Sequence, residues 1–400
     1  MTTAAIELES LPTGLPPGSA AAEQDAVDVP RLRALVETAT PADIDRVLSR
    51  IRGGAPIGPG GPSGAGGRRL EDFAVLLSAP AGARLEELAA AAHALTVRRF
   101  GRTVHLFAPL YLSNECVSVC TYCGFSAGNE IARRTLSLEE VVGEARALHA
   151  RGFRHVLLVA GEHARIVSKH YLVACAEALA PIVPSLSVEV QVWDTDTYHR
   201  LVRAGCDGLV VYQETYDRGT YAACHRKGKK RNYDWRLSAP DRGAEAGMRR
   251  LGIGALLGLH PDWRAEAIAV AAHAQALIRR WWRTEVTVSL PRLRPAAGGY
   301  EPANPIADRD FVQLLCALRL VLPDVGLSLS TRESAPFRNG LLPLGVTTMS
   351  AGSHTEPGGY ASPSEAEPQF EINDDRAPDI VAASLRAAGY DPVWKDWQRS

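Results

Sequence analysis

The stretch "VHLFAPLYLSNECVSVCTYC", residues 104–123, joins an apolar run at 104–112 to three closely spaced cysteines. Such a run is typical of a buried β-strand. Beyond it, the chain alternates short apolar runs rich in β-branched residues with amphipathic stretches of helical length. This alternation predicts βα units and a parallel sheet.

The number of these units predicts how the sheet closes. Eight βα units are typical of an α/β fold of the closed (βα)8 TIM type, in which the chemistry lies at the carboxyl ends of the strands. An open doubly wound sheet is the alternative, but no G-x-G-x-x-G motif follows the first strand. We expect strands at 104–112, 155–161, 186–193, 208–215, 253–259, 286–290, 327–331 and 345–350, with helices between them.

The segments that flank the barrel divide the chain further. Residues 1–30 are rich in Ala, Pro, Glu and Ser, lack a periodic apolar pattern and are expected to be poorly ordered. Residues 31–100 carry helical patterns, interrupted by a Gly- and Pro-rich linker at 53–67, and predict a helical extension. We expect the barrel to occupy residues 101–355 and the C-terminal tail, 356–400, to pack on it.

Composition limits the possible partners. The formal net charge of -1 gives no field for binding nucleic acid. No apolar run approaches the roughly 18 residues that span a bilayer, and no secretory signal is recognisable, so we expect a cytoplasmic protein without a membrane segment. The basic run "CHRKGKKR", residues 224–231, is interpreted as a solvated loop.

The cysteines are the strongest indication of chemistry. Seven of them, irregularly placed, are too few for a disulfide framework. Cys116, Cys120 and Cys123 follow the first strand, at the catalytic face of the predicted barrel. Three thiolates on one loop can hold three irons of a four-iron cluster and leave the fourth open to an exogenous ligand. From spacing alone, the alternative is a zinc site completed by His163 or His260.

The spacing Cys-x3-Cys-x2-Cys, with Tyr122 before the last cysteine, resembles the motif of radical S-adenosylmethionine (SAM) enzymes. Similarity to the tyrosine lyases of that family extends through "LLVAGEH", "VYQETY", "PDRGAEAG", "RLRPAAGGYEP" and "LSTRES", and covers residues 39–397. The resemblance implies a radical SAM barrel with two cofactors, a 4Fe-4S cluster and SAM. In that family the reduced cluster splits SAM to give a 5′-deoxyadenosyl radical.

The resemblance also assigns roles to residues at strand ends. It places Gly161 and Glu162 at the amino group of the methionine moiety of SAM, where a carboxylate suits an ammonium group, although Glu162 could instead be the N-cap of the next helix. It places the backbone of Tyr122 against the adenine. Polar side chains also end the third and fourth strands, at Glu189, Gln191, Gln213 and Glu214. They are expected to contact ribose or substrate, with ordinary hydrogen bonding inside the barrel as the alternative.

Residues on later strands are implied to hold the substrate amino acid. Arg332, after the seventh strand, is expected to bind its carboxylate through two parallel hydrogen bonds, and an ion pair with the neighbouring glutamate is the alternative. Ser350 ends the eighth strand and Tyr111 ends the first, and both match positions that face the amino acid in related lyases. Arg292 and Arg294 follow the sixth strand and are expected to reach SAM or substrate.

The activity implied by the resemblance is cleavage of the Cα–Cβ bond of L-tyrosine. The products are 2-iminoacetate, which supplies the thiazole of thiamine, and 4-cresol, while SAM is split to 5′-deoxyadenosine and methionine. The implied partners are L-tyrosine, a thiazole synthase that receives the product, and a flavodoxin- or ferredoxin-type electron donor.

Two other interpretations stay open at this point. A related radical SAM enzyme would act on another aromatic amino acid, as a tryptophan lyase or a deazaflavin synthase does. A non-catalytic barrel would bind zinc at the cysteines and leave SAM intact. A hydrogenase-maturation enzyme is disfavoured, because no cysteine follows Cys316 to hold the second cluster of such enzymes.

Overall fold

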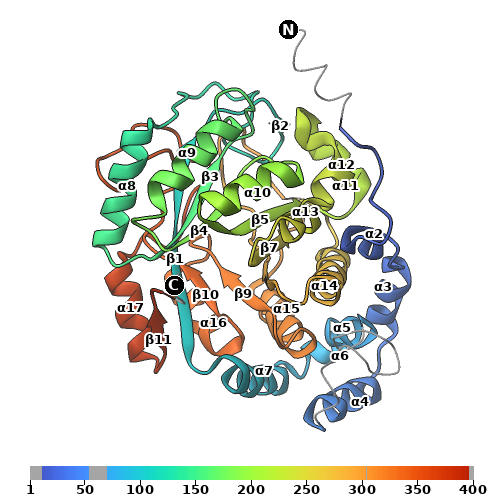
Figure 1. Ribbon diagram of the computed structural model, residues 1–400. Helices are drawn as coiled ribbons and strands as arrows, with labels where there is room; N and C mark the ends of the chain where they lie inside the picture. Colours follow the sequence, from blue (N-terminus) through green and yellow to red (C-terminus); the bar gives the residue numbers. More distant parts are fainter. Residues whose placement is uncertain (1–10, 54–69, 303, 396–400) are drawn as a thin grey trace.

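The computed structural model describes residues 11–53, 70–302 and 304–395, and its centre is a ring of parallel strands (Figure 1). The strands of the ring are β1 (Thr103–Ser113), β3 (His155–Ala160), β4 (Ser185–Glu189), β5 (Cys206–Glu214), β7 (Arg250–Ala255), β8 (Glu285–Ser289), β9 (Gly326–Leu329) and β10 (Thr348–Ser350). Their order is β10-β9-β8-β7-β5-β4-β3-β1, and pairing of β10 with β1 closes the barrel. The predicted (βα)8 fold is confirmed.

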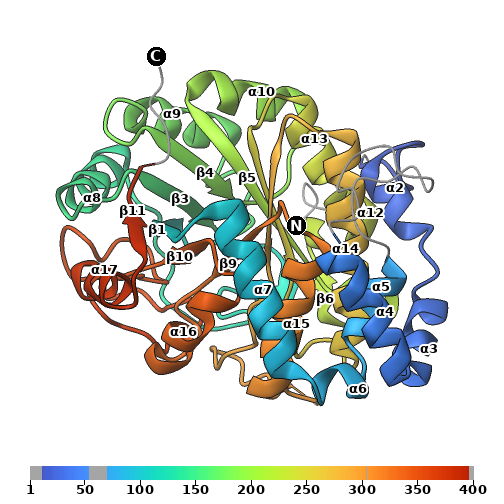
Figure 2. The same cartoon turned by 90° about the horizontal axis from the view of Figure 1, so that it is seen from below.

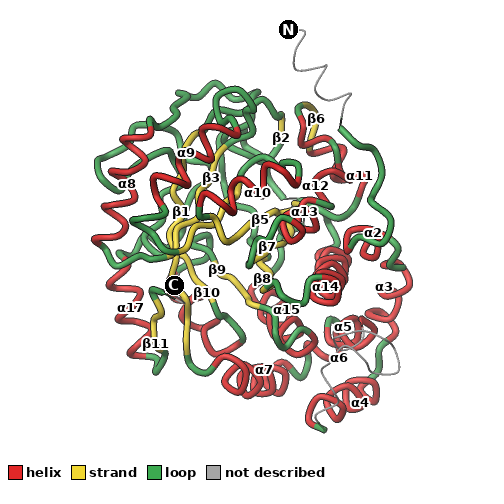
Figure 3. Tube along the Cα trace, in the orientation of Figure 1, coloured by secondary structure: helices red, strands yellow, loops and turns green. Residues whose placement is uncertain are grey.

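Helices surround this barrel (Figure 3). They are α8 (Leu138–Ala150), α9 (Lys169–Leu179), α10 (Thr195–Ala204), α11 (Arg218–Cys224), α12 (Tyr233–Leu237), α13 (Ala239–Glu245), α14 (Trp263–Arg280), α15 (Asp308–Val321) and α16 (Ala335–Leu341). Local sequence sets their ends. Ser137 and Glu140 form a reciprocal capping box at the start of α8, and Gly205, at a φ of 116°, ends α10 in a left-handed conformation. Among the helices of the described ranges, none has the length and apolar character needed to cross a membrane.

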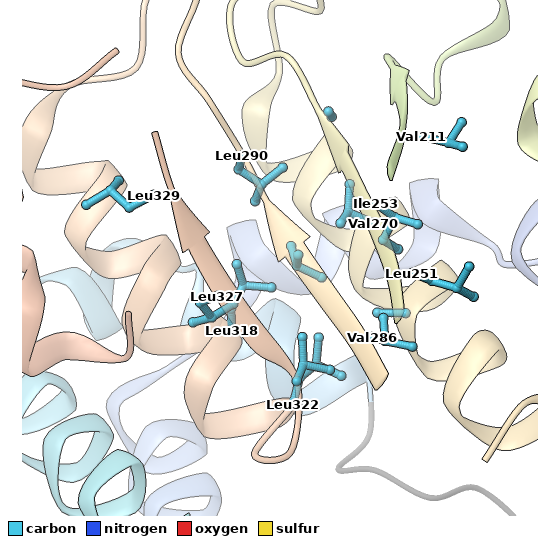
Figure 4. Packing of buried hydrophobic residues seen from close by; sticks show 14 of the residues in the cluster. Val211, Leu251, Ile253, Val270, Val286, Leu290, Leu318, Leu322, Leu327 and Leu329 are labelled. Atoms are coloured by element: carbon cyan, nitrogen blue, oxygen red, sulfur yellow. The ribbon is translucent and has the colours of Figure 1, made fainter. Parts of the chain in front are cut away.

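The main core fills the space between the strands and the outer helices. Figure 4 shows Leu251, Val286 and Leu327 on three neighbouring strands, with Val270 of α14 and Leu318 of α15 among the side chains packed around them. These side chains are almost fully buried. Burial of each stabilises the fold by about 1.5–3 kcal/mol relative to exposure, so the periodic apolar pattern of strand and helix accounts for the barrel wall.

An N-terminal set of helices packs against the outside of the barrel. It comprises α2 (Ala20–Asp25), α3 (Val29–Thr38), α4 (Pro41–Arg52), α5 (Leu70–Leu76), α6 (Ala79–Gly82) and α7 (Leu85–Phe100). Of these helices, α2, α3 and α5 contact the barrel helix α14, and α7 contacts the barrel helix α15. The prediction of poor order in residues 1–30 is wrong for residues 20–25, which form α2 and are held by packing against α14. Most of the predicted linker, 53–67, lies outside the described residues.

The C-terminal tail lies on the opposite side of the barrel from α2–α5, as Figures 1 and 2 show. It contains α17 (Pro378–Ala387) and a short strand, β11 (Asp391–Val393). This strand pairs in parallel with residues 103–105 at the start of β1. The tail is thus joined to the barrel by main-chain hydrogen bonds as well as by side-chain packing.

Candidate active site

A cavity of about 940 Å³, including its open mouth, lies at the carboxyl ends of the barrel strands. Its wall brings together residues that lie far apart in the sequence. Of the residues singled out from the sequence, the wall includes Tyr111, Tyr122, Cys123, Glu189, Glu214, Arg294, Arg332 and Ser350. This position is the one at which barrel enzymes bind their substrates.

The cysteine loop is held by a small second sheet. Within the loop, β2 (Val119–Cys120) pairs antiparallel with β6 (His225–Lys227), which belongs to the basic run of the sequence. The Tyr122 hydroxyl is 2.9 Å from His225 Nε2, and Thr121 N donates to the Cys224 carbonyl at 3.0 Å. The basic run therefore supports the cysteine loop.

Side chains also fix the far end of this loop. The Arg133 guanidinium donates to the carbonyl oxygens of Phe125 and Ser126, both at 2.8 Å. The Asn129 amide nitrogen donates to the Cys123 carbonyl at 3.1 Å. Because these carbonyls are already engaged, the loop is preorganised, which reduces the cost of ordering it when a ligand binds.

The three cysteines of the loop fit an iron–sulfur cluster. All are free thiols, and burial raises their pKa values, that of Cys116 to about 12. Binding of metal must therefore displace their protons. In the described part of the chain, no three His, Cys, Asp or Glu side chains are grouped as ligands of one ion. Thiolates that bind three different irons do not need to converge on one point.

Gly161 lies directly behind the cysteine loop. A Cβ atom at this position would be 2.4 Å from the Glu115 carbonyl oxygen and 3.2 Å from the Cys116 Cβ atom. Contacts this short would displace the loop. The glycine therefore permits the end of β3 to approach the loop closely, although Gly161 is not part of the cavity wall.

Glu162 joins the cysteine loop to a buried arginine. Its carboxylate accepts hydrogen bonds from the Ser118 hydroxyl at 2.9 Å and from Arg236 Nη1 at 3.1 Å. The N-cap of α9 is Ser168, so the alternative role of Glu162 as that cap is wrong. A carboxylate held in this way beside the cysteines can receive a cationic group.

A lysine of the basic run reaches the cavity wall. Lys230 Nζ is 2.7 Å from a carboxylate oxygen of Glu214, and Arg236 Nη2 is 3.8 Å from the same oxygen. Burial alone would raise the pKa of Glu214, but Lys230 and Arg236 lower it. Glu214 has a φ of 72°, a conformation that costs a non-glycine residue about 1–3 kcal/mol and is concentrated at functional sites. The interpretation of the whole run as a solvated loop is therefore wrong at Lys230.

Glu189 is a carboxyl group on the cavity wall with no hydrogen-bond or ion-pair partner among the described residues. Burial raises its pKa, and the negative charge of Glu214 raises it further, to about 7. Arg332, Arg236 and Lys230 act in the opposite direction. The side chain therefore changes its charge near neutral pH.

Arg332 is a cation without a counter-ion. Its guanidinium carbon lies 3.3 Å from the centroid of the Phe370 ring, and no carboxylate of the described residues pairs with it. The neighbouring Glu333 binds Arg292 instead, at 2.9 Å from its Nε, so the alternative of an Arg332–Glu333 ion pair is wrong. A partly buried guanidinium without an ion-pair partner, at a cavity wall, suits an anionic ligand such as a carboxylate.

Five of the predicted contact residues do not belong to the cavity wall: Gly161, Glu162, Gln191, Gln213 and Arg292. Arg292 is held by Glu333 and by Asp308, at 2.6 Å, whereas Arg294 lines the cavity. Gln191 donates to the Val167 carbonyl at 3.3 Å. Gln213 is likewise bonded within the barrel, and neither glutamine belongs to the cavity wall. Ordinary internal hydrogen bonding, the alternative considered for the strand-end side chains, holds for these two glutamines.

Two residues of the C-terminal tail, Gln369 and Phe370, complete the wall, and no motif or periodic pattern indicated either of them. Gln369 accepts a hydrogen bond from the Tyr111 hydroxyl at 2.7 Å and donates to the Cys123 sulfur at 3.7 Å. Phe370, next to it, is the ring on which Arg332 stacks. Tyr212 of β5 also lines the cavity but was not predicted, because in the sequence it resembles an aromatic residue that packs within an ordinary strand.

Comparison with known proteins agrees with this geometry. Residues 110–271 match the family model described as the radical SAM superfamily, and residues 289–391 match the biotin and thiamin synthesis associated domain. The chain is 44% identical to the 2-iminoacetate synthase of Escherichia coli over 366 residues, which cover 92% of this chain and 93% of that protein. It is 42% identical to the 2-iminoacetate synthase of Salmonella typhimurium, with the same coverage.

A solved structure has the same architecture. HydG, a maturase of the [FeFe]-hydrogenase, superimposes with a TM-score of 0.84 at 32% sequence identity, over 92% of this chain and 79% of that one. The likeness therefore includes the flanking segments as well as the barrel.

Proposed function

This chain belongs to the 2-iminoacetate synthase family within the radical SAM superfamily, and from that premise we propose the reaction and the roles of its residues. It is a carbon–carbon lyase. We propose that it cleaves the Cα–Cβ bond of L-tyrosine to give 2-iminoacetate and 4-cresol. When bound, the 4Fe-4S cluster and SAM would supply the 5′-deoxyadenosyl radical needed to remove a hydrogen atom from the substrate amino group.

The three cysteines and the charged network beside them would hold the cofactors. Cys116, Cys120 and Cys123 supply three thiolates on one loop, which leaves one iron for an exogenous ligand. Glu162, beside that loop, offers a carboxylate to the ammonium group of SAM. Arg236, bonded to Glu162, holds that carboxylate in place.

The observation that carries the proposal is an unpaired guanidinium on the same cavity wall as a cluster cysteine. Arg332 can bind a carboxylate through two parallel hydrogen bonds, while Phe370 fixes the plane of its guanidinium. Ser350 and Tyr111 lie on the same wall and offer hydroxyl groups to the amino group of the substrate. These residues would orient an amino acid with its amino group toward the cofactors.

The chemistry of the product suggests the partners. An imine such as 2-iminoacetate hydrolyses readily in water, so we propose that a thiazole synthase takes it up near the mouth of the cavity for thiamine synthesis. Reduction of the cluster needs a flavodoxin- or ferredoxin-type donor. We expect these partners, and this enzyme, in the cytoplasm.

A direct assay tests the reaction. The protein is reconstituted with iron and sulfide without oxygen, reduced with dithionite, and given SAM with either L-tyrosine or L-tryptophan. We expect 5′-deoxyadenosine and 4-cresol in equal amounts from tyrosine. An indole-derived product from tryptophan, with no 4-cresol from tyrosine, would show that the enzyme acts on another aromatic amino acid. Cys123→Ala should abolish both products.

Two arginines provide a matched pair of variants in the same assay. Arg332→Ala should raise the KM for tyrosine at least tenfold, because a charge-assisted hydrogen bond contributes about 1.5–3 kcal/mol. Arg292→Ala removes a guanidinium of the same size that is already bound to Glu333 and Asp308. It should change thermal stability more than KM. Equal KM values for the two variants would contradict the role of Arg332.

A further inference from the structure

We propose that Gln369 is a positioning residue that links the cluster ligand Cys123 to Tyr111 and makes the Tyr111 oxygen a hydrogen-bond acceptor for the substrate amino group. The inference rests on the proposed function, since it takes Cys123 as an iron ligand and the cavity as the amino-acid site. Gln369 does not belong to the barrel itself but to the tail that follows β10, the last strand of the barrel.

Gln369 is fixed in place by its main chain. It lies in a strap, residues 366–371, that crosses the cysteine loop. Gln369 N donates to the Thr355 carbonyl at 2.8 Å, and the Gln369 carbonyl accepts from Gly124 N at 3.1 Å. A Cβ atom on Gly124 would be 2.6 Å from that carbonyl oxygen, so the residue after Cys123 must be glycine for the strap to lie this close.

The hydrogen bonds of the Gln369 amide have one consistent direction. The amide has a carbonyl oxygen that only accepts and a nitrogen that only donates. A thiolate bound to iron has no proton, so Cys123 can only accept, and it takes an N–H of Gln369, whose nitrogen is 3.7 Å away. The amide oxygen then faces the Tyr111 hydroxyl, 2.7 Å away, and Tyr111 must donate to it.

This direction determines what Tyr111 can offer to the cavity. Its only proton is used in the bond to Gln369, so the phenol oxygen has only lone pairs left for a ligand. An amino N–H is a donor and matches such an acceptor. The Tyr111 ring is nearly fully buried and meets Phe125 edge to face, at a centroid distance of 5.8 Å, which holds the oxygen in one place.

The strap orients both ends of the amino acid from adjacent residues. Phe370 supports the Arg332 guanidinium that would bind the carboxylate, and Gln369 sets the acceptor that would bind the amino group. The N–H of Gln369 on the Cys123 sulfur has a second effect. Hydrogen bonds to ligand sulfurs stabilise the more negative, reduced cluster and so raise its reduction potential.

The first test measures that potential on the reconstituted full-length protein, by EPR-monitored redox titration. Gln369→Leu and Gln369→Glu both remove the N–H donor. We expect Gln369→Leu to lower the ratio of reduced to oxidised cluster about tenfold at a fixed potential, which is about 59 mV for a one-electron couple. Gln369→Glu, which also adds a negative charge beside the cluster ligand, should lower this ratio by more. Glu367→Gln, an exposed change on the same strap, should leave the midpoint potential unchanged.

The second test measures the KM for tyrosine. Gln369→Leu and Tyr111→Phe should each raise it several-fold, and the double variant should raise it no further, because Gln369 acts on the substrate only through the Tyr111 oxygen. Effects that multiply in the double variant would overturn the link, as would a midpoint potential in both Gln369 variants equal to that of Glu367→Gln. Tyr111→Phe should keep nearly the wild-type midpoint, which separates the two functions of the amide.

The controls separate this inference from the proposed function. Iron and sulfide content and 5′-deoxyadenosine formation by the wild-type protein test the proposed function alone. If both are present and the Gln369 variants match Glu367→Gln in midpoint potential and KM, only the positioning role of Gln369 is overturned. Thermal unfolding monitored by circular dichroism shows whether each variant is folded. If Gln369→Leu does not fold, Gln369→Glu, which keeps the size of the side chain, is the variant compared with Glu367→Gln.

Discussion

Arg332 and Glu189 are charged or titratable side chains that line the cavity, and neither has a side-chain hydrogen-bond or ion-pair partner among the described residues. Removing such groups from water is costly, and most buried charges are therefore paired. Arg236 and Lys230, in the same site, do have carboxylate partners. The contrast indicates that Arg332 and Glu189 are available to bind a ligand, whereas Arg236 and Lys230 stabilise the wall.

The raised pKa of Glu189 leads to a prediction for the cofactor-free protein. Burial and the charge of Glu214 raise the pKa of Glu189 to about 7, above its value near 4.5 in the unfolded chain. The folded state therefore binds the extra proton, and stability should fall by roughly 2 kcal/mol as the pH rises from 5 to 8. Glu189→Gln mimics the protonated form and should be more stable than the wild type at pH 8 but not at pH 5.

Thermal midpoints of both proteins at the two pH values provide the measurement. Arg332, Arg236 and Lys230 act against the shift, and Tyr111 and Tyr212 face the same carboxyl, yet all five keep their charge state between pH 5 and 8. Glu139→Gln, on the exposed face of α8, is the matched control. A difference between Glu189→Gln and wild type that does not change with pH would show that Glu189 has an ordinary pKa.

Individual site residues differed in how far the sequence predicted them. The cysteines and Arg332 were recognisable because their spacing or motif is local. Gln369 and Phe370 were not, because their roles depend on where a tail without strand pattern crosses the cavity. Lys230 was misread, since a run of basic residues gives no sign of which member turns inward.

At the scale of elements, strands and helices followed the pattern of apolar residues, although the bounds of single strands differ; the strand expected at 253–259, for example, lies at 250–255. All eight barrel strands were expected, because a strand buried on both faces must be apolar throughout. The pairing of β2 with β6 was not expected. Each has only two or three residues and no periodicity, so tertiary contacts and not local propensity form this ladder.

One buried ion pair ties the C-terminal tail to the end of the barrel. Arg338 of α16 and Asp374 of the tail are both fully buried and form an ion pair, and Arg338 also donates to the Ser350 carbonyl. Asp374→Asn would leave the buried guanidinium without its charge partner. We expect the free energy of unfolding to fall by about 3–5 kcal/mol, as measured by urea denaturation.

Arg376 provides the control for this pair. It also binds Asp374, at 2.7 Å, but is partly exposed, so Arg376→Gln should cost clearly less than Asp374→Asn. Equal losses for the two variants would mean that the pair with Arg338 contributes nothing beyond a surface ion pair.

At the scale of the whole molecule, closure of the barrel brings the ends of β1, β4, β5, β9 and β10 to one cavity. The class of fold and the face that carries the chemistry follow from this topology and could be expected from sequence. The course of the two flanking segments could not, because neither repeats the βα pattern. The C-terminal tail enters the active site, whereas the helices α2, α3, α5 and α7 pack on the outer helices.

This division predicts that the N-terminal helices can be loosened without loss of function. Asp241 of α13 accepts hydrogen bonds from Ala20 N at 3.0 Å, from Ala21 N at 3.1 Å and from Trp281 Nε1 at 2.8 Å. Asp241→Asn replaces one acceptor oxygen by a donor, so the start of α2 should lose about 1–2 kcal/mol of local stability. Amide hydrogen exchange in residues 19–26 should become faster.

Because no residue of α2 or α14 belongs to the cavity wall, the KM for tyrosine should stay at the wild-type value. Asp196→Asn, which removes an exposed surface charge on α10, is the control and should change neither exchange in residues 19–26 nor KM. An increase in KM for Asp241→Asn alone would show that α2 is coupled to the cavity through α13 and α14. The N-terminal helices would then be part of the working site and not only of its outer support.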